Sequence, residues 1–540
     1  MLRIRTFKLS AFSTCVATLI CILLCVVVSG CGKNTLTNKT RKGVKENDTV
    51  PQYVCTKIVD DEKAVLNVIN LRMKAGEVVC LAPGIYNDIE LSFGGSGTQK
   101  KPIVVKTQVP GTVTISGKSR IRMTGTHVVF QGFIFQNGYS AAQSLFVTGV
   151  DDIPCQYCRI TENSIIGWDS SNKEKSTRIA DHGKHNRIDH NWFSGKKNHG
   201  VLLNVKRSDG LPDYTVIDHN YFGNRPPAGG KAYPSFRDSG MEIILIGSSR
   251  YHETPSFTEV KYNLFENIRA ETEVVSIKSS RNVFHGNTVR ASYGSISNRH
   301  GSMNVFSNNF ILGDGYPFAG GFRLADSGHI LVNNYIEKVA YPGTRNHGAI
   351  VLMSADNESE YEPGFSGYKR VENVVIAHNT IVESVSSLLL SGGASKKLMP
   401  RNITIMNNVI DKTVGPVLTY LDQGLPPGST IRNNQVFGEE LTDVSSMLEI
   451  DGFIFKDMNL VQKNGFLRAV AGSLPLVSAD SRDNLSVERV AELLRIDIDG
   501  QPRGDKTDIG ADQSNSNEPT NIYPLTPRAV GPKSYSKSRI

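Results

Sequence analysis

A short motif of apolar residues around an asparagine recurs along the middle of the chain. It reads IDHNWF at Asn191, IDHNYF at Asn220 and VKYNLF at Asn263. The whole series comprises Asn191, Asn220, Asn263, Asn287, Asn309, Asn334, Asn379, Asn408 and Asn434, with gaps of 29, 43, 24, 22, 25, 45, 29 and 26 residues. A repeat of roughly 20 to 50 residues indicates a stack of similar units.

The segments between these asparagines are short β-rich runs separated by turns, without helical periodicity. One unit is therefore strand-turn-strand-turn-strand, which predicts an all-β fold, a right-handed, single-stranded parallel β-helix. The gaps of 43 and 45 residues allow two interpretations: one coil with an inserted loop, or two coils of which one has lost the motif. An asparagine tolerates a left-handed backbone and bonds its own turn, so stacked coils should align these amides in a ladder.

The start of the chain has the features of an export signal. Arg3, Arg5 and Lys8 precede an apolar run over 11–28, which is typical of a secretory signal peptide. Val28-Ser29-Gly30-Cys31 resembles the lipobox of bacterial lipoproteins, so residues 1–30 are predicted to be removed and Cys31 to be lipidated. An uncleaved membrane anchor is the alternative, because the run is close to spanning length. We expect an exported lipoprotein, held by its lipid at the outer membrane, in the periplasm or at the cell surface.

Composition divides the rest of the chain. Residues 31–50 are polar and aperiodic, which predicts a flexible tether. Residues 51–460 are expected to form the β-helix, and the apolar spacing over 61–73 predicts a helix that caps its N-terminal end. Residues 461–540 lose the repeat and are expected to be a C-terminal extension packed on the coils, with an end that wraps the surface or is disordered.

The net charge limits the classes of partner that we expect, and the cysteine content limits the kinds of cysteine site. Removal of residues 1–30 takes the basic count from 60 to 57 and leaves 52 acidic residues, so the net charge falls from +8 to +5. Without basic blocks or interleaved aromatics this does not indicate nucleic-acid binding, whereas an anionic polymer suits a groove that gathers the charge.

Four cysteines remain in the exported part, namely Cys55, Cys80, Cys155 and Cys158, and their pairing is left open. Cys155 and Cys158 form a CxxC without a second half, which favours a structural bridge or free thiols over a redox or zinc site.

Long basic side chains recur at nearly one phase of the repeat. Lys278 lies 15 residues after Asn263, Arg299 lies 12 after Asn287, and Arg323 lies 14 after Asn309. Arg345, 11 residues after Asn334, is expected to extend the series. Stacked coils are about 4.8 Å apart, so we predict a column of cations that an extended anionic chain can reach.

Two carboxylates precede the first of these cations, in the stretch ETEVVSIKS. Glu271 and Glu273 are two residues apart and share one face of a strand, where they repel each other unless a cation lies between them. Their hard oxygen atoms suit Ca²⁺. The alternative is a solvated strand edge whose acids are balanced by Lys278 and Arg299.

Several motifs together resemble polysaccharide lyase family 6, which contains alginate lyases and chondroitinase B. They are AETEVVSIKS (270–279), SISNRHG (295–301), GGFRLADSGH (320–329) and the closing DIDGQPRGDKTDIGADQ. The resemblance covers roughly residues 55–532 and implies a parallel β-helix that cleaves uronate-containing polysaccharides by β-elimination. By position, Lys278 matches the Brønsted base and Arg299 the catalytic arginine. Glu271 and Glu273 match calcium ligands, and His300 and Arg323 match substrate-contacting residues.

The resemblance also implies a division of chemical labour. A neutral amine at Lys278 can take the C5 proton of a uronate, and Arg299 can stabilise the charge that develops near the leaving oxygen. Bound Ca²⁺ would neutralise the neighbouring carboxylate. Three positions depart from the family pattern: Ser239 stands where the third calcium ligand is an asparagine, Leu245 replaces an arginine and Ile277 replaces an asparagine. Catalysis is still expected, while calcium binding is left open.

We therefore expect an alginate lyase, with a chondroitin or dermatan sulfate lyase as the nearest alternative. A glycoside hydrolase on the same fold requires two suitably spaced carboxyl groups, for which Asp314 and Asp326 are the candidates. A surface glycan-binding β-helix that has lost catalysis is a third possibility, suggested by Ser239, Leu245 and Ile277.

Overall fold

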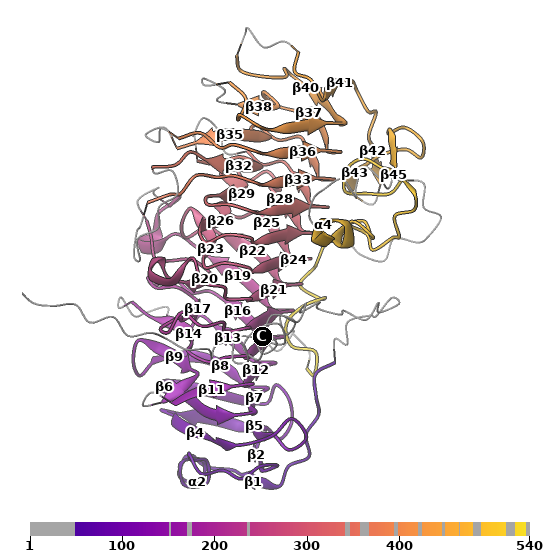
Figure 1. Cartoon of the computed structure of the whole chain (residues 1–540). Helices are drawn as coiled ribbons and strands as arrows, with labels where there is room; N and C mark the ends of the chain where they lie inside the picture. The colour runs from indigo at the N-terminus through magenta and orange to yellow at the C-terminus, as the bar shows by residue number, and fades with distance from the viewer. Residues whose placement is uncertain are drawn as a thin grey trace, which may run out of the picture. The chain divides into compact units, whose positions relative to one another are not determined.

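Three parallel β-sheets, built from successive turns of the chain, form a β-helix in the computed structural model (Figure 1). The structure describes residues 49–150, 153–169, 175–234, 238–340, 346–356, 367–393, 398–419, 424–444, 449–463, 465–478, 488–514 and 524–535. The predicted signal peptide, nearly all of the predicted tether, the predicted lipidation site Cys31 and the predicted substrate contact Arg345 lie outside these residues. The chain divides into two units, Met1–Pro51 and Gln52–Ile540, and the β-helix belongs to the second.

Each sheet takes one strand from most coils. Sheet 1 contains β1 (Lys57–Val59), β2 (Val78–Leu81), β5 (Ile103–Thr107), β7 (Val128–Gln131), β12 (Arg159–Thr161), β15 (Arg187–Asp189), β18 (Val216–Asp218), β21 (Glu259–Lys261), β24 (Val283–His285), β27 (Val305–Ser307), β30 (Ile330–Val332), β33 (Val375–Ala377), β36 (Thr404–Met406) and β39 (Thr430–Arg432). Sheet 2 contains β3 (Gly84–Asn87), β6 (Val113–Thr126), β8 (Ile134–Ser140), β13 (Ser164–Ile166), β16 (Trp192–Ser194), β19 (Tyr221–Arg225), β22 (Leu264–Ile268), β25 (Thr288–Arg290), β28 (Phe310–Leu312), β31 (Tyr335–Glu337), β34 (Thr380–Val382), β37 (Val409–Thr413), β40 (Asn434–Gly438) and β41 (Phe453–Phe455).

Sheet 3 carries the predicted chemistry. It contains β4 (Glu90–Ser96), the far half of the long strand β6, β9 (Ser144–Val147), β11 (Ile153–Gln156), β14 (Thr177–Asp181), β17 (Leu203–Val205), β20 (Ile244–Gly247), β23 (Glu273–Lys278), β26 (Gly294–His300), β29 (Ala319–Leu324), β32 (Ile350–Met353), β35 (Leu388–Gly392) and β38 (Leu418–Thr419). The two-residue strand β10 (Gly149–Val150) pairs antiparallel with β11.

The predicted asparagine ladder is confirmed at the turn between sheets 1 and 2. The backbone N–H and the side-chain Nδ2 of Asn287 both donate to Oδ1 of Asn309, at 2.9 and 3.2 Å. The same pattern links every predicted member to the next, and Asn163 adds a further rung before Asn191. The two long gaps are single coils with inserted loops, because Asn220 bonds Asn263 directly and Asn334 bonds Asn379.

One detail of the ladder differs from expectation. The left-handed residue is the one before each ladder asparagine, for example His219 with φ 54° and Asn308 with φ 55°. The asparagine itself is free of that strain, and its buried amide instead satisfies the backbone groups of the turns above and below.

The interior of the coils is filled by aligned apolar side chains. Phe193, Phe222 and Phe265 stack at centroid distances of 5.3 and 5.0 Å on three successive coils. On sheet 3, Ile246 and Ile277 lie in the same core. Alternate residues of a strand face opposite sides of a sheet. The residues that flank these isoleucines on their own strands therefore face the outer surface of sheet 3.

The first end of the stack carries helix α2 (Glu62–Val68), which begins where Asp61 accepts the N–H of Ala64 at 2.8 Å. Figure 1 shows α2 beside β1 at that end, and Val65 is buried in the main core. The predicted helix is therefore present within 61–73, while its action as a cap stays a prediction. Cys55 is bonded to Cys80 and Cys155 to Cys158, so all four cysteines of the second unit form disulfides.

The described residues after β41 lie against the outside of the coils (Figure 1). They form two antiparallel pairs, β42 (Val461–Lys463) with β43 (Phe466–Arg468) and β44 (Leu476–Ser478) with β45 (Lys506–Asp508), and helix α4 (Glu488–Leu493). Further on, Leu525 N–H donates to Thr288 Oγ1 at 2.8 Å and Tyr535 hydroxyl bonds Ser164 Oγ at 2.8 Å. The chain thus returns along coils far earlier in sequence.

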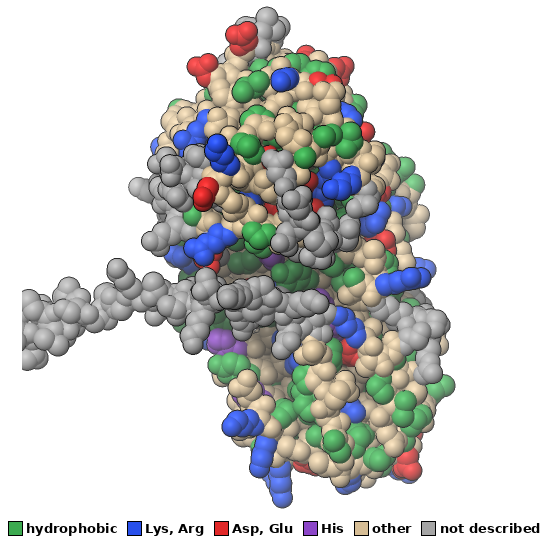
Figure 2. Space-filling model, turned by 90° about the vertical axis from the view of Figure 1, so that its right-hand side faces the viewer, with side chains coloured by type: hydrophobic (Ala, Val, Ile, Leu, Met, Phe, Trp, Pro, Cys, Tyr) green, Lys and Arg blue, Asp and Glu red, His purple; other side chains and the backbone are tan. Residues whose placement is uncertain are grey.

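Figure 2 shows one side of the molecule, where Lys and Arg side chains are scattered among Asp, Glu and hydrophobic ones. The short 3-10 helices η1 (Ala228–Gly230) and η2 (Ser249–Tyr251) lie in the loops around β20. Among the described residues, none of the helices has the length and apolar character needed to cross a membrane.

Candidate active site

The predicted functional residues come together on three neighbouring strands of sheet 3. Lys278 ends β23, Arg299 and His300 end β26, and Arg323 lies near the end of β29. The strands are hydrogen-bonded in the order β20-β23-β26-β29. Residues from three successive coils therefore meet on one face.

The register within this group differs from the predicted column. A register shift between Ile277 and Lys278 places His300, not Arg299, opposite Lys278. Arg323 is opposite Ser297, two residues before Arg299. The basic groups therefore form a staggered cluster, because bulges change the alignment of side chains that a constant repeat would place in one row.

The carboxylate of Glu273 contacts both arginines of this group. Its Oε1 accepts Nη1 of Arg299 at 3.4 Å and forms an ion pair with Nη2 of Arg323. Burial alone would raise the pKa of Glu273, but Arg323 and then Arg299 hold that pKa below its usual range. The Arg323 side chain is only 9% exposed whereas that of Arg299 is 42% exposed, so Arg299 is the guanidinium that remains accessible to a ligand.

Three buried carboxylates meet beside this pair. One oxygen each from Glu242, Glu271 and Glu273 lies within 4.8 Å of the others. Glu242 was not among the predicted ligands. The sequence contains a signal that could have found it, because the stretch MEIILIG resembles TEVVSIK. The structure pairs Ile244 with Val275, and this register places Glu242 next to Glu273.

Within the carboxylate cluster, the charges of Glu242 and Glu271 are less well balanced than that of Glu273. Burial and the neighbouring Glu242 raise the pKa of Glu271 to about 9, and burial followed by Glu273 raises the pKa of Glu242. Glu271 Oε2 accepts the N–H of Met241 at 2.5 Å, while Glu242 Oε2 is buried and has no hydrogen-bond partner among the described residues. Three hard oxygen donors, one of them unsatisfied, fit a divalent cation such as Ca²⁺.

The residues that depart from the family pattern take different places. Ser239, at the position of the asparagine ligand, is exposed, and Asp238 is paired with Lys231 at 3.1 Å. Leu245 is half-buried opposite Ser276 on the outer row of sheet 3. Ile277, where the family has an asparagine, lies in the core.

His300 is also covered. Its side chain is 1% exposed, and burial lowers its pKa to about 4. Asp326, one of the two carboxyl groups considered for hydrolysis, is likewise buried, and Asp314 is bound by Arg290 at 2.8 Å on another sheet. These two acids do not face each other across one groove.

Comparison with known proteins places this geometry in a family. The sequence model of the chondroitinase B family matches residues 59–497. The chain therefore belongs to the chondroitinase B family, polysaccharide lyase family 6. The comparison with curated proteins gives no significant match.

Solved structures of the family have the same fold. The alginate lyase AlyGC is 26% identical with a TM-score of 0.70, and the similarity covers 89% of this chain and 59% of that one. A mannuronic acid-specific family 6 lyase from human gut microbiota is 28% identical with a TM-score of 0.66, covering 74% of this chain and 91% of that one. The family 6 lyase Pedsa3628 from Pseudopedobacter saltans, 21% identical with a TM-score of 0.59 over 89% of this chain and all of that one, supports the fold alone. This chain thus spans 59% of the length of AlyGC.

Proposed function

We propose that the chain is a polysaccharide lyase that cleaves alginate by β-elimination. The observation that carries the proposal is the convergence of Lys278 and Arg299, from adjacent strands, around the buried Glu273. Family membership and the 26–28% identity to two family 6 lyases, one an alginate lyase and one specific for mannuronic acid, support the same reaction class.

In this reaction the base removes the proton on C5 of a uronate, the electron pair forms the C4–C5 double bond, and the C4–O bond breaks. Lys278 is half-buried at the end of β23 and is assigned as the base. Arg299 is assigned the role of stabilising the negative charge on the departing oxygen, because its guanidinium is held by Glu273 and is still exposed. The buried Arg323 forms an ion pair with Glu273. It is assigned the role of fixing Glu273, which in turn positions Arg299.

Glu242, Glu271 and Glu273 would hold a calcium ion. When bound there, Ca²⁺ supplies charge that neutralises the substrate carboxylate and makes the neighbouring C–H bond more acidic. The polymer itself is an anionic uronate chain, and the exposed guanidinium of Arg299 gives it a positively charged contact beside the base Lys278.

The test is a substrate panel followed by ultraviolet absorbance of the unsaturated product. The parent is expected to act on poly-mannuronate, poly-guluronate or mixed alginate. Lys278→Ala should lower the rate by about 10² to 10⁴-fold, whereas the matched control Lys206→Ala, an exposed lysine of an earlier coil, should leave it unchanged. A folded parent that is silent on all three polymers would overturn the assignment.

A chondroitin or dermatan sulfate lyase is the second candidate, favoured by the match to the chondroitinase B model. It predicts activity on the sulfated polymer and none on alginate, so the same panel separates the two. Binding without turnover, unaffected by Lys278→Ala, would instead indicate a surface glycan binder. We also propose export and a lipid anchor at Cys31, which metabolic labelling with a fatty acid tests against Cys31→Ser.

A further inference from the structure

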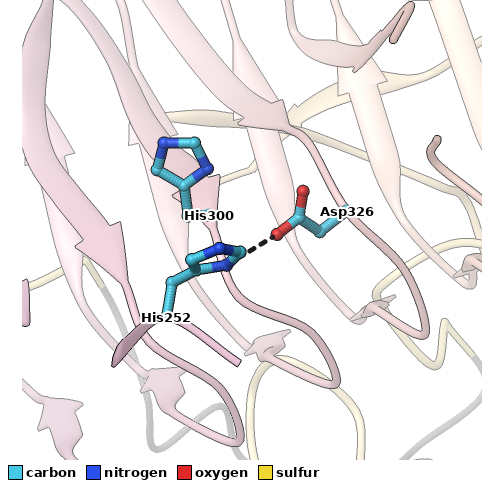
Figure 3. Close-up of side chains that lie close together, drawn as sticks. All are labelled: His252, His300 and Asp326. Carbon is cyan, nitrogen blue, oxygen red and sulfur yellow. Dashed lines mark ion pairs between the residues drawn. The ribbon is translucent and has the colours of Figure 1, made fainter. Parts of the chain in front are cut away.

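A second group of potential metal ligands lies at the ends of the strands that carry the candidate active site. It consists of His252, just after η2, His300 at the end of β26 and Asp326, two residues after β29. Figure 3 shows the two rings and the carboxylate converging on one space. One ligand atom from each lies within 4.8 Å of the others, and the three residues are 0%, 1% and 1% exposed. The group shares no residue with the carboxylate cluster of Glu242, Glu271 and Glu273.

The donor set differs from the carboxylate cluster in chemistry. Two imidazoles and one carboxylate are ligands typical of Zn²⁺ and other first-row transition metals, whereas all-oxygen sets suit calcium. Ligands about 2.1 Å from a tetrahedral metal lie roughly 3.4 Å apart. Nδ1 of His252 and Oδ2 of Asp326, which form an ion pair, are 3.5 Å apart, a separation that also fits two ligands of one metal ion.

The carboxylate of the group is already oriented by the backbone. Oδ2 of Asp326 accepts the N–H of Gly301 at 2.6 Å, and Oδ1 accepts the N–H of Lys369 at 3.3 Å. Such hydrogen bonds to a ligating carboxylate are the outer shell that metal sites use to hold their ligands.

His300 supplies the observation that points to a ligand. Its Nδ1 is buried and has no hydrogen-bond partner among the described residues. In Figure 3 one ring nitrogen of His300 faces the gap towards Asp326 and His252. A buried, unsatisfied imidazole nitrogen is costly, and a metal ion would satisfy it together with the other two donors.

We propose that His252, His300 and Asp326 form a transition-metal site, with Zn²⁺ as its chemical class of ligand and water in the fourth position. The site lies next to the proposed base, because His300 is the strand partner of Lys278. The proposal concerns metal binding only and does not depend on the lyase activity.

The test is a titration of the purified full chain, stripped with chelator and then kept in excess Ca²⁺ so that the carboxylate cluster is not available to other ions. Zn²⁺ is titrated by calorimetry, and Co²⁺ by the visible absorption that a tetrahedral nitrogen-oxygen site produces. The parent should bind one equivalent of either metal. His252→Gln and His300→Gln should weaken binding by about 100-fold or more.

Matched variants separate the site from other donors. His185→Gln, an exposed histidine between β14 and β15, and Glu242→Gln, in the carboxylate cluster, should bind Zn²⁺ as the parent does. If a histidine variant does not fold, Asp326→Asn keeps the side-chain shape and should also weaken Zn²⁺ binding and remove the tetrahedral Co²⁺ spectrum. Absence of binding by the folded parent, or equal binding by His252→Gln or Asp326→Asn, would overturn the proposal.

Discussion

Arg323 on β29 reaches across the intervening strand β26 to pair with Glu273 on β23. The two residues are 50 positions apart in sequence and both are buried, yet one carboxylate oxygen serves Arg323 and the exposed Arg299 together. This relationship links a buried ion pair on sheet 3 to the accessible guanidinium of Arg299.

Arg323→Gln should destabilise the protein and lower turnover. The substitution leaves Glu273 among two other carboxylates without its buried cationic partner, and breaking a buried pair from one side costs about 3–5 kcal/mol. Thermal melting and kinetics on alginate measure the two effects. The double variant Glu273→Gln/Arg323→Gln should regain part of the lost stability but none of the activity, because it removes both buried charges. An unchanged melting temperature in the single variant would contradict the buried pair.

Glu242→Gln should weaken calcium binding. The substitution removes one of three clustered charges and replaces a carboxylate oxygen by an amide nitrogen that cannot bind the ion, so the calcium dissociation constant should rise about 10-fold or more. Calorimetric titration of the chelated protein measures it. Glu259→Gln, an acid on sheet 1 paired with Lys261, is the matched control and should bind like the parent. Equal affinity in Glu242→Gln would place any calcium elsewhere.

Asn287→Ala should be strongly destabilising although it lies far from the chemistry. The amide of Asn287 accepts the N–H of Asn263 at 3.0 Å and donates to Val260 O at 2.8 Å, so its loss strands several buried backbone groups. At about 1–3 kcal/mol for each unsatisfied group, a loss of about 3 kcal/mol or more is expected. Chemical denaturation checks this, with the exposed Asn70→Ala as a control that should change little.

Asp411→Asn should stabilise the protein at neutral and alkaline pH. Asp411 is fully buried, and burial followed by the charge of Asp457 raises its pKa to about 6. The folded state therefore holds a proton that the unfolded state has released, so stability is lost as pH rises from about 4 through about 6. The variant lacks this loss and should be more stable by about 3 kcal/mol at pH 8, with the difference vanishing near pH 4.

Melting curves of parent and variant between pH 4 and pH 8 measure the effect. Asp451→Asn, an exposed acid on the same end of the chain, is the control and should run parallel to the parent. A gap between parent and Asp411→Asn that stays constant with pH would contradict the assignment.

The sequence alone determined the architecture because the repeat is local and self-similar. Each asparagine motif marks one coil, and the amides bond from coil to coil, so Asn191 to Asn434 could be aligned without knowing any long-range contact. It also placed Lys278, Arg299, Arg323 and the pair Glu271 and Glu273 near one another, since residues at similar phases of stacked coils must be neighbours.

Only the tertiary structure decided the details that chemistry needs. A register shift between β23 and β26 places His300 instead of Arg299 opposite Lys278, and a bulge of one residue leaves no trace in the spacing of a repeat. Glu242 joined the carboxylates from a coil separated by an inserted loop, and His252 and Asp326 met His300 through turns rather than strands. Repeat periodicity sets which coils touch, whereas loops, bulges and buried charge pairs set which atoms do.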